Sequence, residues 1–202
     1  AMSSLNTHAD YVAEMARQLM FAQYGPDIYT RGLNVYTTIR ASDQQAAYFA
    51  LRRGIMDFER RQHYRGPERF INLPEKAAEL EDAIDDALIE QGDKGDLLAA
   101  VVLEATPKKV RVVRQNSEVL EITGEGLQPV QSGLSDKAAP NIKLRPGALV
   151  RITKTAKGGW EITQLPEVEG AFVSIDPRDG AIHALVGGFD FNKNKFNHVT
   201  QA

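Results

Sequence analysis

The sequence contains no cysteine, which excludes a disulfide framework and any metal site built from thiolates. It also lacks any run of about eighteen or more apolar residues, so no segment has the length of a membrane-spanning helix. Aromatic residues make up 7% of the chain and include a single tryptophan, Trp160. Positive and negative charges nearly cancel to a net −3, which argues against a dedicated nucleic-acid binder held by a large basic field.

The composition is otherwise that of a folded globular protein. Hydrophobic residues are 43% of the 202 residues, which is enough material for a core. A chain of this length lies between one large domain and two small ones, because domains usually run to about 100–150 residues. We therefore expect a main body that carries one insertion.

The first third of the chain predicts a helix, a strand and a second helix. The first helix is capped at Asn6 or Thr7 and ends at Gly25-Pro26. The run from Gly32 to Ile39 is rich in β-branched and aromatic residues and predicts a strand. The second helix begins at Ser42. The apolar faces are predicted to hold Tyr11, Val12, Met15 and Leu19 in the first helix, and Ala46, Ala50, Leu51, Ile55 and Phe58 in the second.

The middle of the chain predicts a small barrel. Proline breaks the helical pattern at Tyr64-Arg65-Gly66-Pro67, where we place a domain crossing. A helix is expected from Pro74 to Glu90, closed by Gly92, and its acidic face is interpreted as solvated. Short β runs follow at residues 97–104, 109–115, 119–123, 148–154 and 160–165, with a long loop at 128–144. Five such strands predict a barrel of the oligonucleotide/oligosaccharide-binding (OB) type.

The last part of the chain predicts a β-hairpin. Residues 170–175 and 181–186 are the strands, and Asp176-Pro177-Arg178-Asp179-Gly180 is a proline-initiated turn closed by glycine. An isolated hairpin is marginally stable, so it must lie on another element. The available partners are the strand at 35–39 and the helix at 42–58.

Three stretches together resemble the class A penicillin-binding proteins, the bifunctional peptidoglycan glycosyltransferase/transpeptidases of bacterial envelopes. The first joins residues 11–18 (YVAEMARQ) and Tyr24-Gly25 to GLNVYTTI at 32–39. The second is YRGP at 64–67, after which related members carry an inserted barrel. The third is GAFVSIDPRDG at 170–180 with IHALVGG at 182–188 and KFNHVTQA at 195–202.

This resemblance implies an α+β fold, with a five-stranded OB-like barrel inserted into a truncated transpeptidase sheet that has flanking helices. Residues 1–67 would be the interdomain linker and the start of the transpeptidase domain, 68–168 the inserted barrel, and 169–202 the returning hairpin. In that family the run Thr200-Gln201-Ala202 leads a few residues later into the Ser-x-x-Lys helix, whose serine attacks the peptide or β-lactam carbonyl. Neither that motif nor Ser-x-Asn or Lys-Thr-Gly occurs here.

The resemblance therefore implies a parent enzyme that is anchored in the inner membrane and works on its periplasmic side in cell-wall synthesis and cell shape. The parent polymerises glycan strands and cross-links their peptides through a serine acyl-enzyme that β-lactams inhibit. For this chain alone we expect no transpeptidase activity, and we assign it no catalytic, cofactor-binding or metal-binding residue and no cofactor.

Several residues could be mistaken for a catalytic site. Lys154-Thr155-Ala156-Lys157-Gly158-Gly159 is similar to Lys-Thr-Gly, but Ala156 stands where glycine is needed, and the run is interpreted as a hairpin turn. Asp176 and Asp179 are interpreted as turn residues rather than an acid/base pair. No serine is followed by a lysine three positions later in a helix: Ser3, Ser4, Ser42, Ser117, Ser132, Ser135 and Ser174 all fail.

The histidines and a glycine pair are also given structural roles. His183 lies in an apolar strand without a second histidine at metal-ligand spacing, and is interpreted as a buried or partly buried hydrogen-bonded side chain. His8, His63 and His198 are likewise isolated. Gly187-Gly188 is interpreted as a strand end that allows close backbone approach, not as a phosphate loop.

The partner of the barrel is left open between two hypotheses. The first is that the barrel docks a regulatory envelope lipoprotein or peptidoglycan. The second is an independent OB-type module that binds a polyanion or oligonucleotide, which Trp160 as the sole aromatic of the strand region disfavours. The unpaired sheet edges would also allow association between copies of the chain. The basic residues behind the second hypothesis are Lys108, Lys109, Arg111, Arg114, Arg145, Arg151, Lys154 and Lys157.

Overall fold

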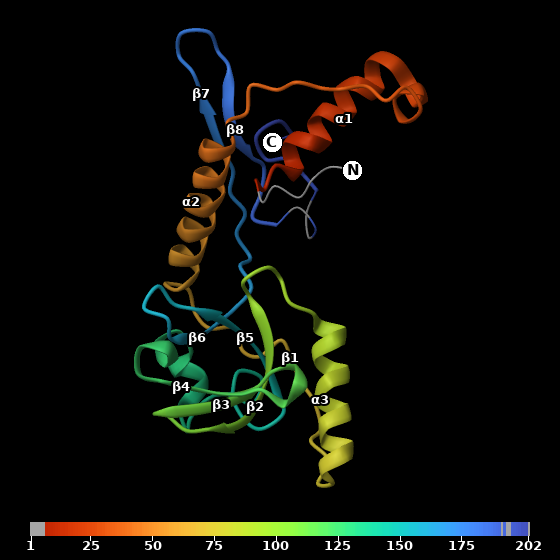
Figure 1. The fold of residues 1–202 in the computed structure, drawn as a ribbon. Coiled ribbons are helices and arrows are strands. Elements are labelled where there is room, and N and C mark those ends of the chain that lie inside the picture. Colours follow the sequence, from red (N-terminus) through yellow and green to blue (C-terminus); the bar gives the residue numbers. More distant parts are fainter. Residues whose placement is uncertain (1–6, 191, 193–194, 202) are drawn as a thin grey trace. The chain divides into compact units, whose positions relative to one another are not determined.

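The computed structural model describes residues 7–190, 192 and 195–201 and divides the chain into two compact units (Figure 1). The first unit contains Ala1–Phe58 and Pro166–Ala202, and the second contains Glu59–Leu165. The chain thus leaves the first unit once and returns to it once. The fold is α+β, as predicted.

The first unit is built around a β-hairpin. Strands β7 (Phe172–Ile175) and β8 (Ile182–Val186) pair antiparallel with Val173 opposite Leu185. Two helices belong to this unit, α1 (Asp10–Tyr24) and α2 (Ala41–Glu59), the latter ending on the first residue of the second unit. A short 3-10 helix, η1 (Gly25–Tyr29), follows α1. The predicted hairpin is confirmed.

Helix α1 is shorter than predicted. Of its two proposed caps, Asn6 lies outside the described residues, and Thr7 lies three residues before the helix start at Asp10. His8 has a positive φ of 51°, which is not helical. Tyr11 and Val12 are buried as predicted, but Leu19 is 64% exposed. That part of the prediction is wrong because α1 packs on β8 through its first turns only.

The predicted strand at 32–39 does not form. This segment carries no strand, and its largest apolar side chains are exposed, Tyr36 at 93%. It nevertheless reaches β8 at its end, where the Thr38 hydroxyl donates to the Ile182 carbonyl (2.7 Å) and the Arg40 N–H donates to the His183 carbonyl (2.9 Å). Such isolated contacts do not make a ladder, because a strand needs repeated main-chain pairing.

Helix α2 packs on the hairpin through a face that is partly polar. Ala47, with Tyr48 and Leu51 beside it, contacts Ala184 and Val186 of β8. The prediction was wrong at Ala46, which is exposed, and at Phe58, which is 40% exposed. Sequence periodicity missed the polar members of the buried face, Gln44 and Arg52, because it counts only apolar residues.

The second unit is a curved antiparallel sheet. Its strands are β1 (Arg69–Phe70), β2 (Leu98–Ala105), β3 (Lys109–Val113), β4 (Val119–Thr123), β5 (Ala148–Lys154) and β6 (Trp160–Thr163). The order is β1-β5-β2-β3-β4, and β6 also pairs with β5. Strands β4 and β6 approach each other without a ladder. The five predicted strands are confirmed, and the two-residue β1 is an addition.

Period-two alternation gives this sheet two apolar faces. Ala100 and Val102 of β2 face one core, while Ala99 and Val101 face the other, which α3 (Ala77–Gln91) covers with Ile84 and Leu88.

The Gly92 N–H donates to the Leu88 carbonyl and ends α3 as predicted. Most of the predicted loop at 128–144 is irregular, but it begins in a 3-10 helix, η3 (Gly124–Val130), and a helical turn, α4 (Gln131–Leu134). A short 3-10 helix, η2 (Gln115–Ser117), links β3 to β4.

Polar side chains tie together the ends of the second unit. The buried carboxylate of Glu59 accepts hydrogen bonds from the Arg65 guanidinium and the Gln164 amide. The Gln164 oxygen in turn accepts from the Arg65 N–H (2.9 Å), and the Arg65 guanidinium donates to the Leu165 carbonyl (2.6 Å). The residues that enter the unit are thereby bound to those that leave it.

Candidate functional site

The turn that joins β7 to β8 is held by its own aspartates. The Asp176 carboxylate accepts from the Arg178 N–H (3.0 Å) and from its guanidinium (2.7 Å). These bonds to Arg178 lower the pKa of Asp176 from 3.8 to about 2. The Asp179 carboxylate accepts from the Ala181 N–H (2.9 Å). Both carboxylates therefore serve the turn, and the pKa of Asp176 is lowered, whereas a general acid needs a raised one.

The Lys154–Gly159 run forms the connection between β5 and β6. The Thr155 N–H donates to the Gly159 carbonyl (2.9 Å), and the Thr155 hydroxyl accepts from the Gly159 N–H (3.1 Å). Gly158 has a φ of 82°, which a turn of this kind requires of glycine. The threonine is thus a turn residue inside the second unit.

Ser117 and His8 make structural contacts in the described part of the chain. Ser3 and Ser4 lie outside it, and Ser117 donates to Glu81 (3.1 Å). His183 is half-buried in β8. His8 stacks on Tyr48 with ring centroids 3.6 Å apart, and burial lowers its pKa. Among the described residues no cluster of three or more metal-ligating side chains occurs.

The two edges of the hairpin differ. Gln44 of α2 pairs with β8 as a neighbouring strand would. Its side-chain oxygen accepts from the Leu185 N–H (2.8 Å), and its side-chain nitrogen donates to the Leu185 carbonyl (2.8 Å). The Thr38 hydroxyl donates to the Ile182 carbonyl, and the Arg40 N–H donates to the His183 carbonyl. In the described chain β7 pairs with β8 alone. The outer edge of β7 is therefore the open edge of the sheet, and its Val173 and Ile175 are 40% and 52% exposed.

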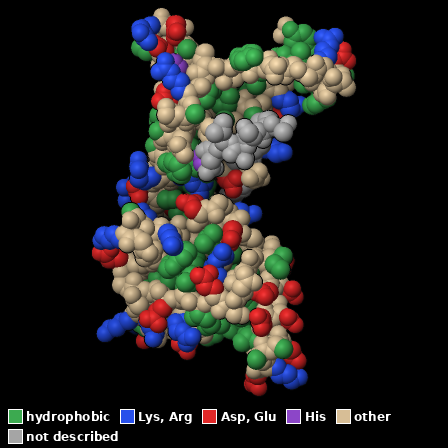
Figure 2. Space-filling model, viewed as in Figure 1, with side chains coloured by type: hydrophobic (Ala, Val, Ile, Leu, Met, Phe, Trp, Pro, Cys, Tyr) green, Lys and Arg blue, Asp and Glu red, His purple; other side chains and the backbone are tan. Residues whose placement is uncertain are grey.

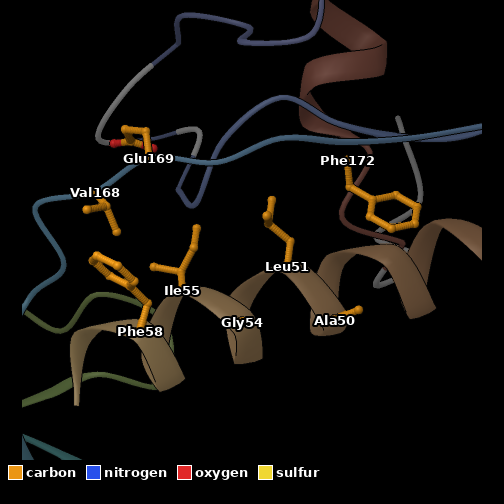
Figure 3. Close-up of a pocket in the computed structure, with 8 residues that line it drawn as sticks. All are labelled: Ala50, Leu51, Gly54, Ile55, Phe58, Val168, Glu169 and Phe172. Atoms are coloured by element: carbon orange, nitrogen blue, oxygen red, sulfur yellow. The ribbon is translucent and has the colours of Figure 1, made fainter. Parts of the chain in front are cut away.

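An apolar hollow of about 480 Å³ lies beside α2. Figure 3 shows Leu51, Ile55 and Phe58 on the helix, with Val168 and Phe172 on the chain opposite. Of the described residues that line the hollow, Glu169 alone is charged. A site for a small substrate needs several polar groups that converge on it. This hollow instead offers a surface for apolar packing.

The basic residues of the second unit are largely matched. Lys109, Arg111, Arg114 and Lys157 each contact a carboxylate within 4 Å, and Arg145 stacks over the Phe70 ring at 3.8 Å. Arg151 was counted among the residues that give the barrel a positive character, but this expectation is wrong because its side chain is fully buried. On the face seen in Figure 2, acidic side chains gather over α3.

Arg151 is a central polar contact of the second unit. Its guanidinium donates twice to the Glu68 carboxylate (2.9 and 2.7 Å) and to the carbonyls of Gly92 (2.7 Å) and Leu97 (3.2 Å). These bonds join the chain before β1, the end of α3 and the start of β2. No sequence pattern predicts this role, since it depends on contacts between distant segments.

The comparisons with known proteins agree with one another. A profile of the penicillin-binding protein OB-like domain matches residues 64–168. "Penicillin-binding protein 1A" of Neisseria lactamica is 36% identical over 202 residues, which are 100% of this chain and 25% of that protein. The protein of that name from Escherichia coli (strain K12) is 35% identical over 96% of this chain and 23% of its own length.

A solved structure is also similar to this chain. The crystal structure of penicillin-binding protein 1A from Haemophilus influenzae matches 96% of this chain and 28% of that one, with a TM-score of 0.77 and 30% identity. The chain thus spans about a quarter of the length of these relatives. In the described residues no helix is both long and apolar enough to cross a membrane.

Proposed function

This chain belongs to the class A penicillin-binding proteins, and we propose that it serves a bifunctional peptidoglycan synthase. The synthase would polymerise glycan strands and cross-link their peptides through a serine acyl-enzyme, on the periplasmic side of the inner membrane. The observation that carries this proposal is the 36% identity to a penicillin-binding protein 1A, which extends over all 202 residues. We propose that the activity belongs to a longer protein, in which this chain would correspond to about a quarter of the length, as it does in that relative.

Within that protein we assign the first unit a supporting role in the transpeptidase domain. Its carboxylates Asp176 and Asp179 are engaged in a turn, and its strand β8 is already covered by Gln44. The free edge of β7 and the apolar hollow beside α2 are the surfaces on which further polypeptide would pack. We therefore infer that the sheet of the transpeptidase domain continues from β7.

A labelling experiment tests this assignment. A fluorescent penicillin should acylate the longer protein and leave the 202-residue chain unlabelled, because the attacking serine would come from elsewhere in the sequence. Val173→Pro would block one edge of β7 and should abolish labelling of the longer protein. Labelling of the 202-residue chain, or normal labelling of the proline variant, would contradict the proposal.

We propose that the second unit is a docking module for a regulatory envelope protein. Its support is the match of residues 64–168 to a separate domain family and the pairing of most of its basic residues, which does not favour a polyanion. The unit also has two hydrophobic cores of its own, and polar side chains join its first residues to its last. We therefore expect that the second unit can be removed without unfolding the first.

The docking role can be tested by deletion. Replacing residues 60–164 by a short glycine-serine linker in the longer protein should leave penicillin labelling intact and remove the captured partner. The matched comparison is the intact protein, washed at the same salt concentration. Equal capture by both forms would refute the docking role, and capture of glycan strands alone would identify peptidoglycan as the ligand instead.

A further inference from the structure

The pair Gly187-Gly188 directly after β8 admits a side chain from α1. Neither glycine has a positive φ, so the backbone conformation does not demand glycine. Space does. An ideal Cβ on Gly188 would lie 2.3 Å from the Tyr11 hydroxyl, and one on Gly187 would lie 2.7 Å from Cδ1 of the same ring. The two glycines therefore form a notch for Tyr11, and the expected close approach is made by a side chain rather than by backbone.

Tyr11 fills this notch as a buried, protonated phenol. The residue is 4% exposed and packs with Val12 and Leu185. Burial raises the pKa of Tyr11 to about 12, and the nearby charges of Glu169, Asp190 and Asp10 act in the same direction. The phenol is thus neutral at ordinary pH, which suits a packed side chain better than a proton-transfer group.

The segment at residues 197–201 rests against the same notch. A Cβ on Gly187 would lie 2.4 Å from the Asn197 side-chain oxygen, and the Gly187 carbonyl accepts from the His198 N–H (2.9 Å). The Asn197 side chain accepts from the Val199 N–H (3.1 Å). Gln201 closes the turn, since its side-chain oxygen accepts from the Asn197 N–H (2.8 Å) and its own N–H donates to the Asn197 carbonyl (2.8 Å).

We propose that Tyr11 is a positioning residue for acylation: through the Gly187-Gly188 notch, helix α1 fixes the turn at 197–201, from which the family resemblance implies that the chain approaches the attacking serine. This inference rests on the proposed function. Catalysis is sensitive to such placement, because a displacement of about 1 Å at the reacting group costs on the order of a hundredfold in rate. The helix α1 thereby becomes part of the support of the acylation site, although it contributes no reacting atom.

The notch allows a test by complementary substitutions in the longer protein. Gly188→Ala places a methyl group at the Tyr11 hydroxyl, and we expect the second-order rate of acylation by a fluorescent penicillin to fall by about tenfold to a hundredfold. Tyr11→Phe removes the hydroxyl, after which the nearest ring carbon would be 3.1 Å from the added Cβ. The double variant should therefore regain most of the lost rate. Gly159→Ala, whose Cβ would meet only the Thr155 hydroxyl at 3.5 Å, is the matched control.

The outcomes separate this inference from the proposed function. If the unmodified protein is not acylated, the proposed function fails. If it is acylated and Gly188→Ala reacts at the same rate, or if Tyr11→Phe gives no rescue, the positioning role is refuted. Hydrogen exchange at residues 197–201 gives an independent measurement, because Gly188→Ala should accelerate exchange there and the double variant should restore protection. Unchanged exchange in Gly188→Ala would also overturn the inference.

Discussion

Replacing Arg151 by alanine should destabilise the second unit more than any surface substitution. The guanidinium is fully buried and makes four hydrogen bonds, two of them to Glu68. Its removal leaves the Glu68 carboxylate, only 19% exposed, without its cation. It also removes the guanidinium bond to the Gly92 carbonyl, whereas the Leu97 carbonyl still accepts from the Lys94 N–H. Breaking a buried ion pair in this way costs about 3–5 kcal/mol. Because Glu68 keeps some contact with water, the lower end of that range is expected.

The single tryptophan makes this measurement specific. Trp160 lies in β6, so its fluorescence reports the unfolding of the second unit. With a urea dependence of about 2 kcal/mol/M, a loss of about 3 kcal/mol lowers the midpoint by about 1.5 M. Arg111→Ala is the matched control, because its pair with Glu104 is exposed and should be worth under about 1 kcal/mol.

Two results would refute this reasoning. If Arg151→Ala shifts the midpoint no further than Arg111→Ala, the buried pair does not stabilise the unit. If Arg151→Met, which keeps the apolar stem but not the charge, is far less destabilising than Arg151→Ala, lost packing of the side-chain stem would explain the effect better than lost charge pairing.

Three further predictions concern single contacts. Gln44→Leu should cost about 1–3 kcal/mol, because it leaves the buried N–H and carbonyl of Leu185 unpaired; faster exchange of the Leu185 amide would show this, and unchanged exchange would contradict it. Gly126→Ala should cost about 1–3 kcal/mol by overpacking, since its Cβ would lie 2.1 Å from the Trp160 carbonyl; an unaltered urea midpoint by tryptophan fluorescence would disprove the clash. The lowered pKa of Asp176 implies stability that is present above about pH 4 and lost as the pH falls towards 2; Asp176→Asn should lack that acid dependence, as hairpin exchange rates against pH would reveal.

Local sequence patterns determined much of the fold. The five strands of the second unit follow from β-branched runs separated by turn residues, and the β7–β8 turn follows from Asp-Pro-x-Asp-Gly. The end of α3 follows from Gly92. For the turn and the helix end the decisive contacts lie within a few residues, so turn chemistry is sufficient. The strands were found from their composition, although their ladders join distant segments, such as Leu98 with Ile152. The family resemblance was likewise carried by short motifs and is confirmed over the full chain.

Contacts between distant segments were beyond the reach of those patterns. The run at 32–39 has the composition of a strand but no ladder partner, and strand formation depends on that partner. Gln44 and Arg151 have polar side chains that a periodicity argument places in water, yet both are buried because distant backbone groups need their hydrogen bonds.

The sequence alone thus determined the order of the elements, the turn chemistry and the family, because these are written in residues close together in the chain. Only the tertiary structure decided which edge of the hairpin stays open, which polar side chains are buried, and that Tyr11 meets Gly188. The physical reason is that each of these depends on the distance between residues that folding brings together from far apart in the sequence, and no local pattern records that distance.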